Sequence, residues 1–169
     1  MRTTFLALGS NIGSRSNNLL AALKALSAQV RLTAISPVYE ATPMYVSNQP
    51  RFLNMAVQGD TDLPIPGLLA FIKDLERKLG RTPSQRFGPR MIDIDILFYG
   101  SETTQSPSIV IPHPGLHERI FVLRPLADIA PNWVHPHSGD TVVEMLAVIK
   151  DDQAELIKLA HVEWDQTSI

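Results

Sequence analysis

The segment Met91-Ile92-Asp93-Ile94-Asp95-Ile96-Leu97-Phe98-Tyr99 alternates apolar and acidic side chains, and its pattern determines how the fold is interpreted. Alternation with a period of two is typical of a β-strand, where successive side chains point to opposite faces. One face is therefore expected to enter the core through Ile92, Ile94, Ile96 and Phe98. The other face is expected to carry Asp93 and Asp95, with Cα atoms roughly 7 Å apart at about 3.3 Å per residue.

Five patterned segments precede this strand. Strands are predicted over 3–8, 30–39 and 52–58, and helices over 16–26 and 64–79. A turn at Gly9-Ser10-Asn11 is expected to end the first strand, and Pro37 predicts a bulge or an edge position in the second. The order β-α-β-β-α-β predicts an α+β fold, a ferredoxin-like sandwich with both helices on one face of an antiparallel sheet.

The remainder of the chain is expected to form a C-terminal α/β extension on this core. A short strand is predicted at 109–111, short helices near His117 and Pro125, a helix over 141–149 and a strand-like stretch over 155–164. No repeat, low-complexity tract or linker interrupts the sequence, so residues 1–169 are interpreted as one domain.

The composition favours a globular cytoplasmic enzyme. Hydrophobic residues make up 44% and charged residues 19%, no apolar run has the length of a membrane span, and cysteine is absent. The beginning of the chain shows no signal-peptide pattern. A net charge of −2 argues against a broad nucleic-acid-binding surface. We therefore expect small-molecule partners, no nucleic acid, no membrane and a monomer.

The acidic pair gains meaning from the basic residues around it. Six of the 15 Lys and Arg residues lie between positions 73 and 90, which suits a small, highly charged anion but is also compatible with a solvated helix face. Arg86 and Arg90 directly precede the acidic strand. Two adjacent carboxylates repel each other unless a cation lies between them, and Mg²⁺ is typically bound by one or two carboxylates together with substrate phosphates. A lone Asp-x-Asp motif is weak by itself, but acids for a metal beside guanidinium groups for phosphate indicate phosphoryl-type transfer.

Three further polar residues are candidates for the site. Glu76 interrupts the apolar stripe of the second helix, so its carboxylate is either solvated at the margin or functional, and Lys73 is placed to pair with it. His113 and Arg119 flank a Pro-Gly turn and are candidates for phosphate contacts. His113 and His117 are four residues apart, but Pro114 and Gly115 argue against a regular helix and hence against a helical zinc site. The sequence contains no glycine-rich dinucleotide or P-loop motif.

Several spaced motifs closely resemble those of the hydroxymethyldihydropterin pyrophosphokinase family. The motifs are Ala7-Leu-Gly-Ser-Asn11, Tyr39-Glu-Ala-Thr-Pro43, Gln49-Pro-Arg-Phe-Leu-Asn54, Arg86-Phe-Gly-Pro-Arg-Met-Ile-Asp-Ile-Asp95 and Pro112-His-Pro-Gly-Leu-His-Glu-Arg119. The resemblance covers roughly 5–146. It implies an ATP-dependent diphosphotransferase of folate biosynthesis, in which the hydroxyl of 6-hydroxymethyl-7,8-dihydropterin attacks the β-phosphorus of ATP and AMP is released.

The resemblance also implies a cofactor and a set of site residues. Two Mg²⁺ ions would be held by Asp93 and Asp95, and Arg81 and Arg90 would share in catalysis. The implied ATP contacts are Lys73, Glu76, Arg81, Arg86, Arg90, Ile96, His113 and Arg119. The implied pterin pocket comprises Thr42, Pro43, Met44, Tyr45, Phe52, Asn54, Phe87 and Phe121, with the ring stacked between Phe52 and Phe121.

Three alternatives remain open at this point. A non-catalytic nucleotide-binding regulatory domain could use the same fold, but it would not need paired aspartates. An RNA-binding ferredoxin-like module would explain basic and aromatic side chains, but not the acidic balance. A degenerate family member would bind its substrates and turn over poorly.

Overall fold

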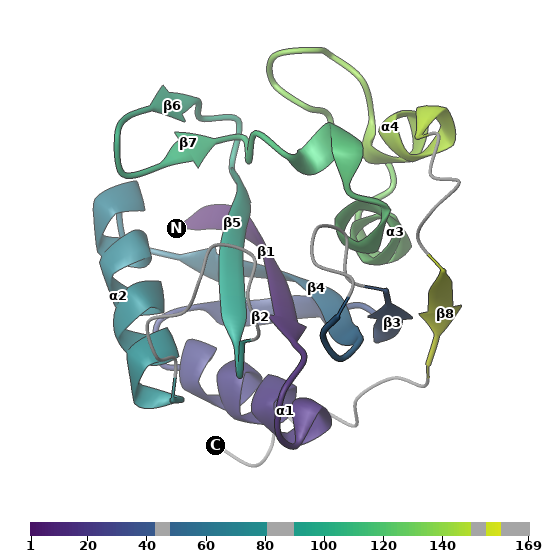
Figure 1. Ribbon diagram of the computed structural model, residues 1–169. Helices are drawn as coiled ribbons and strands as arrows, with labels where there is room; N and C mark the ends of the chain where they lie inside the picture. The colour runs from purple at the N-terminus through teal and green to yellow at the C-terminus, as the bar shows by residue number, and fades with distance from the viewer. Residues whose placement is uncertain (43–47, 81–89, 150–154, 160–169) are drawn as a thin grey trace.

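The computed structural model describes residues 1–42, 48–80, 90–149 and 155–159. Within them the chain forms a mixed α/β structure around one main antiparallel sheet (Figure 1). The strands are β1 (Arg2–Ser10), β2 (Arg31–Ile35), β3 (Tyr39–Ala41), β4 (Phe52–Thr61), β5 (Asp93–Tyr99), β6 (Thr104–Gln105), β7 (Val110–Ile111) and β8 (Leu156–Lys158). The helices are α1 (Arg15–Leu26), α2 (Ile65–Lys78), the 3₁₀ helix η1 (Leu116–Glu118), α3 (Ile120–Ile129) and α4 (Val142–Val148).

The main sheet has the order β5-β1-β4-β3-β8, and β2 also pairs with β4. Its pairings are antiparallel, and the first four predicted strand segments occupy the positions of a ferredoxin-like sheet. The strand predicted over 30–39 is divided into β2 and β3. Pro37 lies between the two parts, where a residue without a backbone N–H removes no ladder hydrogen bond. The fold class predicted from the sequence is confirmed.

The sheet carries a separate apolar cluster on each face. The first joins α1 and α2 to the sheet through side chains such as Leu8, Leu23, Ile72 and Ile94. The second joins α3 and α4 to the sheet and includes Leu123. Figure 1 shows the two helix pairs on different sides of the strands. The extension therefore covers part of the face that a minimal two-helix sandwich would leave bare.

A register shift within β5 corrects one prediction. The pairing of β1 with β5 shifts between Phe5 and Leu6, so Leu97 is an additional residue opposite this step. Such a bulge reverses the alternation of all later side chains. Ile94 and Ile96 lie in the first cluster as predicted, but Phe98 lies in the second. Placing Phe98 on the same face as the isoleucines was therefore wrong.

The two core helices form close to their predicted bounds. The buried side chains of α1 are Leu19, Ala22, Leu23 and Leu26, which lie three or four residues apart. Helix α2 carries Pro66 in its first turn, and Gly80 follows its end with φ of +93°, a conformation that glycine adopts without strain. Among the described residues, none of the helices is both long and apolar enough to cross a membrane.

The C-terminal extension matches the prediction in outline. Helix α3 includes Pro125, and α4 begins with a capping box between Thr141 and Glu144. The short strand β7 pairs with β6, which the sequence did not indicate, and the two form a small separate hairpin (Figure 1). Strand β8 adds to the edge of the main sheet beside β3.

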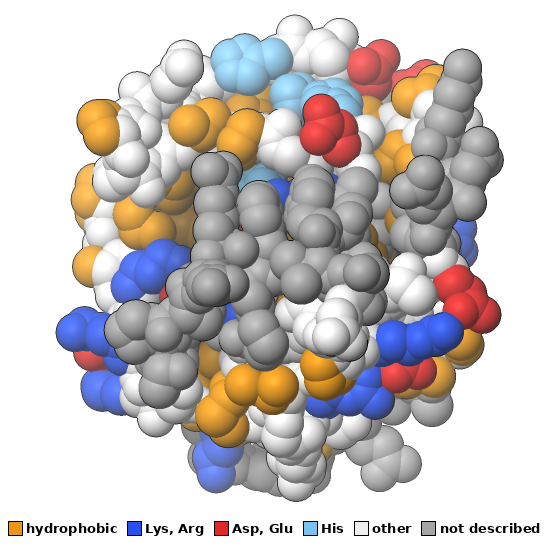
Figure 2. Space-filling model, viewed as in Figure 1, with side chains coloured by type: hydrophobic (Ala, Val, Ile, Leu, Met, Phe, Trp, Pro, Cys, Tyr) orange, Lys and Arg blue, Asp and Glu red, His pale blue; other side chains and the backbone are white. Residues whose placement is uncertain are grey.

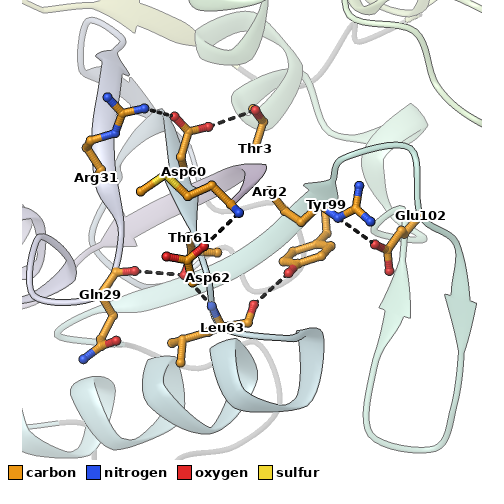
Figure 3. A network of polar contacts seen from close by, with 11 residues as sticks. Arg2, Thr3, Gln29, Arg31, Asp60, Thr61, Asp62, Leu63, Tyr99 and Glu102 are labelled. Atoms are coloured by element: carbon orange, nitrogen blue, oxygen red, sulfur yellow. Dashed lines mark hydrogen bonds and ion pairs between the residues drawn. The ribbon is translucent and has the colours of Figure 1, made fainter.

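The end of the sheet formed by the start of β1 carries a self-contained polar network (Figure 3). Asp60 accepts hydrogen bonds from Thr3 at 2.9 Å and from Arg31 at 2.6 Å. The hydroxyl of Thr61 donates to the Gln29 carbonyl at 2.9 Å and accepts from the Leu63 N–H at 3.1 Å. We call this region the closed end of the sheet, because charged and polar groups there are satisfied by one another.

Candidate active site

Asp93 and Asp95 lie on the same face of β5, at the end of the sheet opposite the closed end. Asp93 is paired with Gly9 and Asp95 with Ala7 in the β1–β5 register, whereas Ile94 between them lies in the first apolar cluster. The residues that face each other across strands share a face of the sheet. The predicted arrangement of the acidic pair, on one face and opposite the isoleucines, is confirmed.

The local environment disfavours a second negative charge on this pair. Partial burial, followed by the nearby charge of Asp93, raises the pKa of Asp95 to about 6, although 35% of its side-chain surface remains exposed. Asp93 is paired with Arg90, whose Nη1 lies 2.6 Å from Oδ1. Arg90 therefore partly neutralises Asp93, and Asp95 keeps its proton to a higher pH than an ordinary aspartate does.

His113 faces the acidic pair in its neutral form. Burial, followed by the positive charge of Arg119, lowers the pKa of His113 to about 4. Its Nδ1 accepts a hydrogen bond from the Gly115 N–H at 3.1 Å, so the proton of the neutral ring is on Nε2. Nε2 lies 3.8 Å from Oδ2 of Asp95. The ring therefore presents an N–H group toward the carboxylate side of the site.

Arg119 is held close to the loop that carries His113. A Cβ atom placed on Gly115 would lie 2.8 Å from Nε of Arg119, so the guanidinium group occupies the space that glycine leaves open. Nε itself is buried without a hydrogen-bond partner among the described residues. A buried cationic donor without a partner is costly, which marks this group as a candidate for an anionic ligand.

Asn54 and Phe52 lie beside the acidic pair, two strands away on β4. Gly9 is paired with Asp93 on one side and with Asn54 on the other, so all three share one face. A Cβ atom on Gly9 would lie 3.3 Å from Oδ1 of Asn54 and 3.8 Å from the Phe52 ring. Nδ2 of Asn54 is buried and has no hydrogen-bond partner among the described residues. Glycine here lets the Asn54 amide and the Phe52 ring approach β1 closely, on the face that carries Asp93.

Glu76 lies behind the acidic strand rather than at a solvated margin. Its side chain is fully buried, and its carboxylate accepts hydrogen bonds from the Ile94 N–H at 2.8 Å and from Lys73 at 3.0 Å. Ile94 is the residue between the two aspartates. Glu76 therefore connects α2 to the backbone of β5 at the point where the acidic side chains originate. The predicted pairing of Lys73 with Glu76 is confirmed.

The described part of the basic segment is a partly neutralised helix surface. Arg77 and Lys78 are exposed on α2, and both pair with Asp74 at 3.2 and 2.7 Å. Figure 2 shows blue side chains along the left of the molecule, where Figure 1 places α2. The pairs with Asp74 agree with a solvated helix face, which was one of the two interpretations of the basic segment. Among the described cations of this segment, Arg90 is the one with an ion pair to Asp93.

The structure does not bring every predicted residue to this face. The side chain of Ile96 is buried in the first cluster, on the other side of the sheet from the aspartates. By contrast, Phe121, the second residue of α3, packs against the second cluster, which lies on the same side of the sheet as the acidic pair. Thr42 directly follows β3. Other predicted site residues lie outside the described residues, namely Pro43, Met44, Tyr45, Arg81, Arg86 and Phe87.

Asn11 is a site residue that the sequence analysis missed. Its Oδ1 accepts from the Arg90 N–H at 2.7 Å, and its Nδ2 donates to Oε1 of Gln49 and to the Pro50 carbonyl, both at 3.1 Å. Gly9 and Ser10 belong to β1, so the expected turn at Gly9-Ser10-Asn11 begins later than predicted. Gly, Ser and Asn are typical turn residues, so the sequence suggested a surface turn at this point. In the structure the Asn11 amide is buried instead.

The fold and the site together define a class: an α+β protein whose open sheet face combines paired carboxylates, arginines and an unsatisfied amide. Residues 5–131 match the family of 7,8-dihydro-6-hydroxymethylpterin-pyrophosphokinase (HPPK). The 2-amino-4-hydroxy-6-hydroxymethyldihydropteridine pyrophosphokinase of Bacillus subtilis is 43% identical over 127 residues, which cover 74% of this chain and 76% of that protein. The chain belongs to the HPPK family, whose enzymes are pyrophosphokinases that use ATP.

Longer relatives contain this region as one part. The folic acid synthesis protein FOL1 of Dictyostelium discoideum is 45% identical over 132 residues, covering 78% of this chain but 20% of that protein. The chain thus spans about a fifth of that relative's length. The crystal structure of Plasmodium falciparum HPPK-DHPS has a TM-score of 0.68 at 16% identity, covering 86% of this chain and 44% of that one. At that identity the likeness supports the fold alone.

Proposed function

We propose that this protein transfers a pyrophosphoryl group from ATP to the hydroxymethyl oxygen of 6-hydroxymethyl-7,8-dihydropterin in folate biosynthesis. The observation that carries the proposal is the position of Asp93 and Asp95 on one face of β5, within a chain that belongs to the HPPK family. A regulatory nucleotide-binding domain would have no need for such a pair. An RNA-binding module would not place two carboxylates on the open face of its sheet.

The donor set of the acidic pair fits magnesium. Carboxylate oxygens are the ligands that Mg²⁺ prefers, and one or two carboxylates with substrate phosphates are a common combination. Burial, followed by the negative charge of Asp93, raises the pKa of Asp95, so a cation at the pair would favour the ionised form of this carboxylate. We propose that Asp93 and Asp95 hold two Mg²⁺ ions together with the triphosphate. When bound, the metal would neutralise phosphate charge and lower the pKa of the attacking hydroxyl.

The residues around the pair divide into two binding regions. Arg90, His113 and Arg119 are proposed to contact the phosphates, because two are permanently cationic and the third presents a neutral N–H donor. Arg81 and Arg86 are proposed to join them from the segment before β5. Glu76 is buried behind β5 and takes a supporting position, and the half-exposed Lys73 pairs with it. Any nucleotide contact at Ile96 would involve its backbone, because its side chain is buried in the first cluster.

The pterin is proposed to bind over Gly9, between Phe52 and Phe121. Nδ2 of Asn54 is a buried donor without a partner among the described residues, and a heteroaromatic ring edge offers the acceptor that it lacks. Flat rings favour stacking on phenylalanine faces. Thr42, Pro43, Met44, Tyr45 and Phe87 complete the proposed pocket.

In the proposed reaction the hydroxymethyl oxygen forms a bond to the β-phosphorus as the bond from that phosphorus to the α–β bridging oxygen breaks. AMP leaves with the bridging oxygen, and the hydroxyl proton passes to solvent. The protein contributes position and charge: the arginines stabilise the phosphate oxygens, while Asn54 and the aromatic rings orient the hydroxymethyl group. The low pKa of His113 keeps its ring neutral at pH 7, so its contribution is hydrogen bonding.

The decisive assay is the release of AMP from Mg-ATP that depends on added hydroxymethyldihydropterin. We expect turnover by the native protein and a loss of about three powers of ten in Asp95→Asn, because the metal site carries much of the transition-state charge. The matched control is Asp60→Asn, which changes a carboxylate of the closed end. Equal activity in the two variants would refute the assignment, and poor turnover by the native protein would indicate a degenerate member.

We also propose that the protein acts as a monomer and that residues 1–169 work as one unit. Both apolar clusters share the same sheet, which supports the second point. Light scattering at assay concentration checks the first point. The cytoplasmic location stays a prediction.

A further inference from the structure

We propose that Asn11 is a positioning residue that sets the spacing between the pterin side and the ATP side of the site. The inference rests on the proposed function. It extends that function to Asn11, which has no hydrogen bond to the side chains of Asp93, Asp95 or Asn54 among the described contacts. Asn11 follows directly after β1, the strand that lies between β5 and β4.

The Asn11 side chain is a buried connection between two segments that are far apart in the sequence. It is 1% exposed. Its Oδ1 accepts from the Arg90 N–H at 2.7 Å, and the Asn11 N–H donates to the Arg90 carbonyl at 3.0 Å. Its Nδ2 donates to Gln49 and to the Pro50 carbonyl. The side-chain amide of Asn11 thus accepts a hydrogen bond from the segment at Arg90 and donates hydrogen bonds to the segment at Gln49 and Pro50.

Each of these segments leads directly into one half of the proposed site. Arg90 pairs with Asp93 at 2.6 Å, so a displacement of the Arg90 backbone moves the guanidinium group that contacts the acidic pair. Pro50 lies two residues before Phe52 and four before Asn54, the two side chains that lie close to Gly9. The amide therefore controls the position of the arginine relative to the aromatic ring and Asn54.

In-line transfer makes this spacing important. The attacking oxygen and the β-phosphorus must approach within reacting distance, and a misplacement of about 1 Å can reduce turnover by about 100-fold. A purely structural amide would behave differently, because its loss would lower stability without changing the kinetics of the molecules that remain folded. The two roles therefore differ in a measurable way.

The test compares Asn11→Ala, Asn11→Asp and Thr61→Val by steady-state kinetics at a temperature where circular dichroism shows all three folded. Thr61 is the matched control, since it is a buried polar residue with two hydrogen bonds at the closed end. We expect Asn11→Ala to lower kcat/KM for the pterin by about 100-fold, with kcat reduced, and Thr61→Val to stay near the native value. Asn11→Asp keeps the acceptor for Arg90 but loses the amide donors, so kcat should partly recover while KM for the pterin stays raised.

Two results would overturn the proposal: native kinetics in Asn11→Ala, or identical kinetics in the Ala and Asp variants. Amide hydrogen exchange gives a readout that does not depend on activity. Arg90 should exchange faster in Asn11→Ala than in the native protein and recover its protection in Asn11→Asp. An inactive native protein would refute the proposed function, whereas the exchange at Arg90 would still decide whether Asn11 holds that segment.

Discussion

The two ends of the sheet use similar residues in opposite ways. At the closed end, Asp60 receives hydrogen bonds from Thr3 and Arg31, and the Tyr99 hydroxyl donates to the Leu63 carbonyl at 2.7 Å (Figure 3). At the other end, two aspartates stand on one face, and the pKa of Asp95 is raised by burial and by its acidic neighbour. Strands β1, β4 and β5 run between the two ends of the sheet.

The difference shows where the protein gives up stability for binding. Polar groups at the closed end find their partners within the fold, which is what folding alone requires. The site end keeps Nδ2 of Asn54 and Nε of Arg119 buried without partners among the described residues. An unsatisfied buried donor costs about 1–3 kcal/mol. Such a cost is understandable if a ligand supplies the missing acceptors, as strained or unsatisfied groups cluster at functional sites.

The largest effect that would sharpen this comparison is expected for Asn54→Leu. Loss of the amide should lower kcat/KM for the pterin by about 100-fold, since a pocket built around a hydrogen bond discriminates strongly. Stability should stay equal or rise, because the unsatisfied donor disappears. Thr61→Val should show the reverse, with native kinetics and a stability loss of about 1–2 kcal/mol from its two hydrogen bonds. Urea denaturation measures the stability of each variant, and the AMP assay measures its kinetics. Asn54→Leu would contradict the comparison if it lost stability but kept native kinetics.

A smaller effect concerns the dependence of stability on pH. The folded-state pKa of Asp95 is about 6, above its unfolded value, so the folded protein binds the proton more tightly. The stability that this proton contributes is present below the unfolded pKa and is lost as pH rises toward 6. Asp95→Asn should therefore gain stability over the native protein between pH 4 and 6 and keep the gain at pH 7. After allowance for solvent screening we expect about 1 kcal/mol, or about 2–4 °C in Tm.

The matched measurement is a series of thermal unfolding curves for both proteins without divalent metal. His113 titrates in the opposite sense, with its pKa lowered to about 4, but it is present in both proteins. The difference between the two curves therefore reports the titration of Asp95 together with its effect on Asp93. A difference that stays constant across this pH range would show that Asp95 has an ordinary pKa and that the acidic pair is not strained.

The sequence predicted what depends on local pattern and missed what depends on pairing. Alternation in the acidic strand predicted that Asp93 and Asp95 share a face. Pro37 predicted a bulge or an edge position, whereas the structure divides that strand into β2 and β3. The bulge opposite Phe5 could not be predicted, because it depends on how two strands align, and it placed Phe98 on the other side. The contacts of Asn11 join it to Gln49 and Arg90, which are 38 and 79 positions away in the sequence. No local pattern brings such distant residues together.

The most direct test of the central claim is a crystal structure with Mn²⁺ in place of Mg²⁺ and with α,β-methylene-ATP, a nucleotide that does not react. The account predicts anomalous density between the carboxylates of Asp93 and Asp95 and the phosphates, at metal–oxygen distances of about 2.1 Å. Metal bound to phosphate alone, with Asp93 still paired to Arg90 and Asp95 contacting no ion, would contradict it.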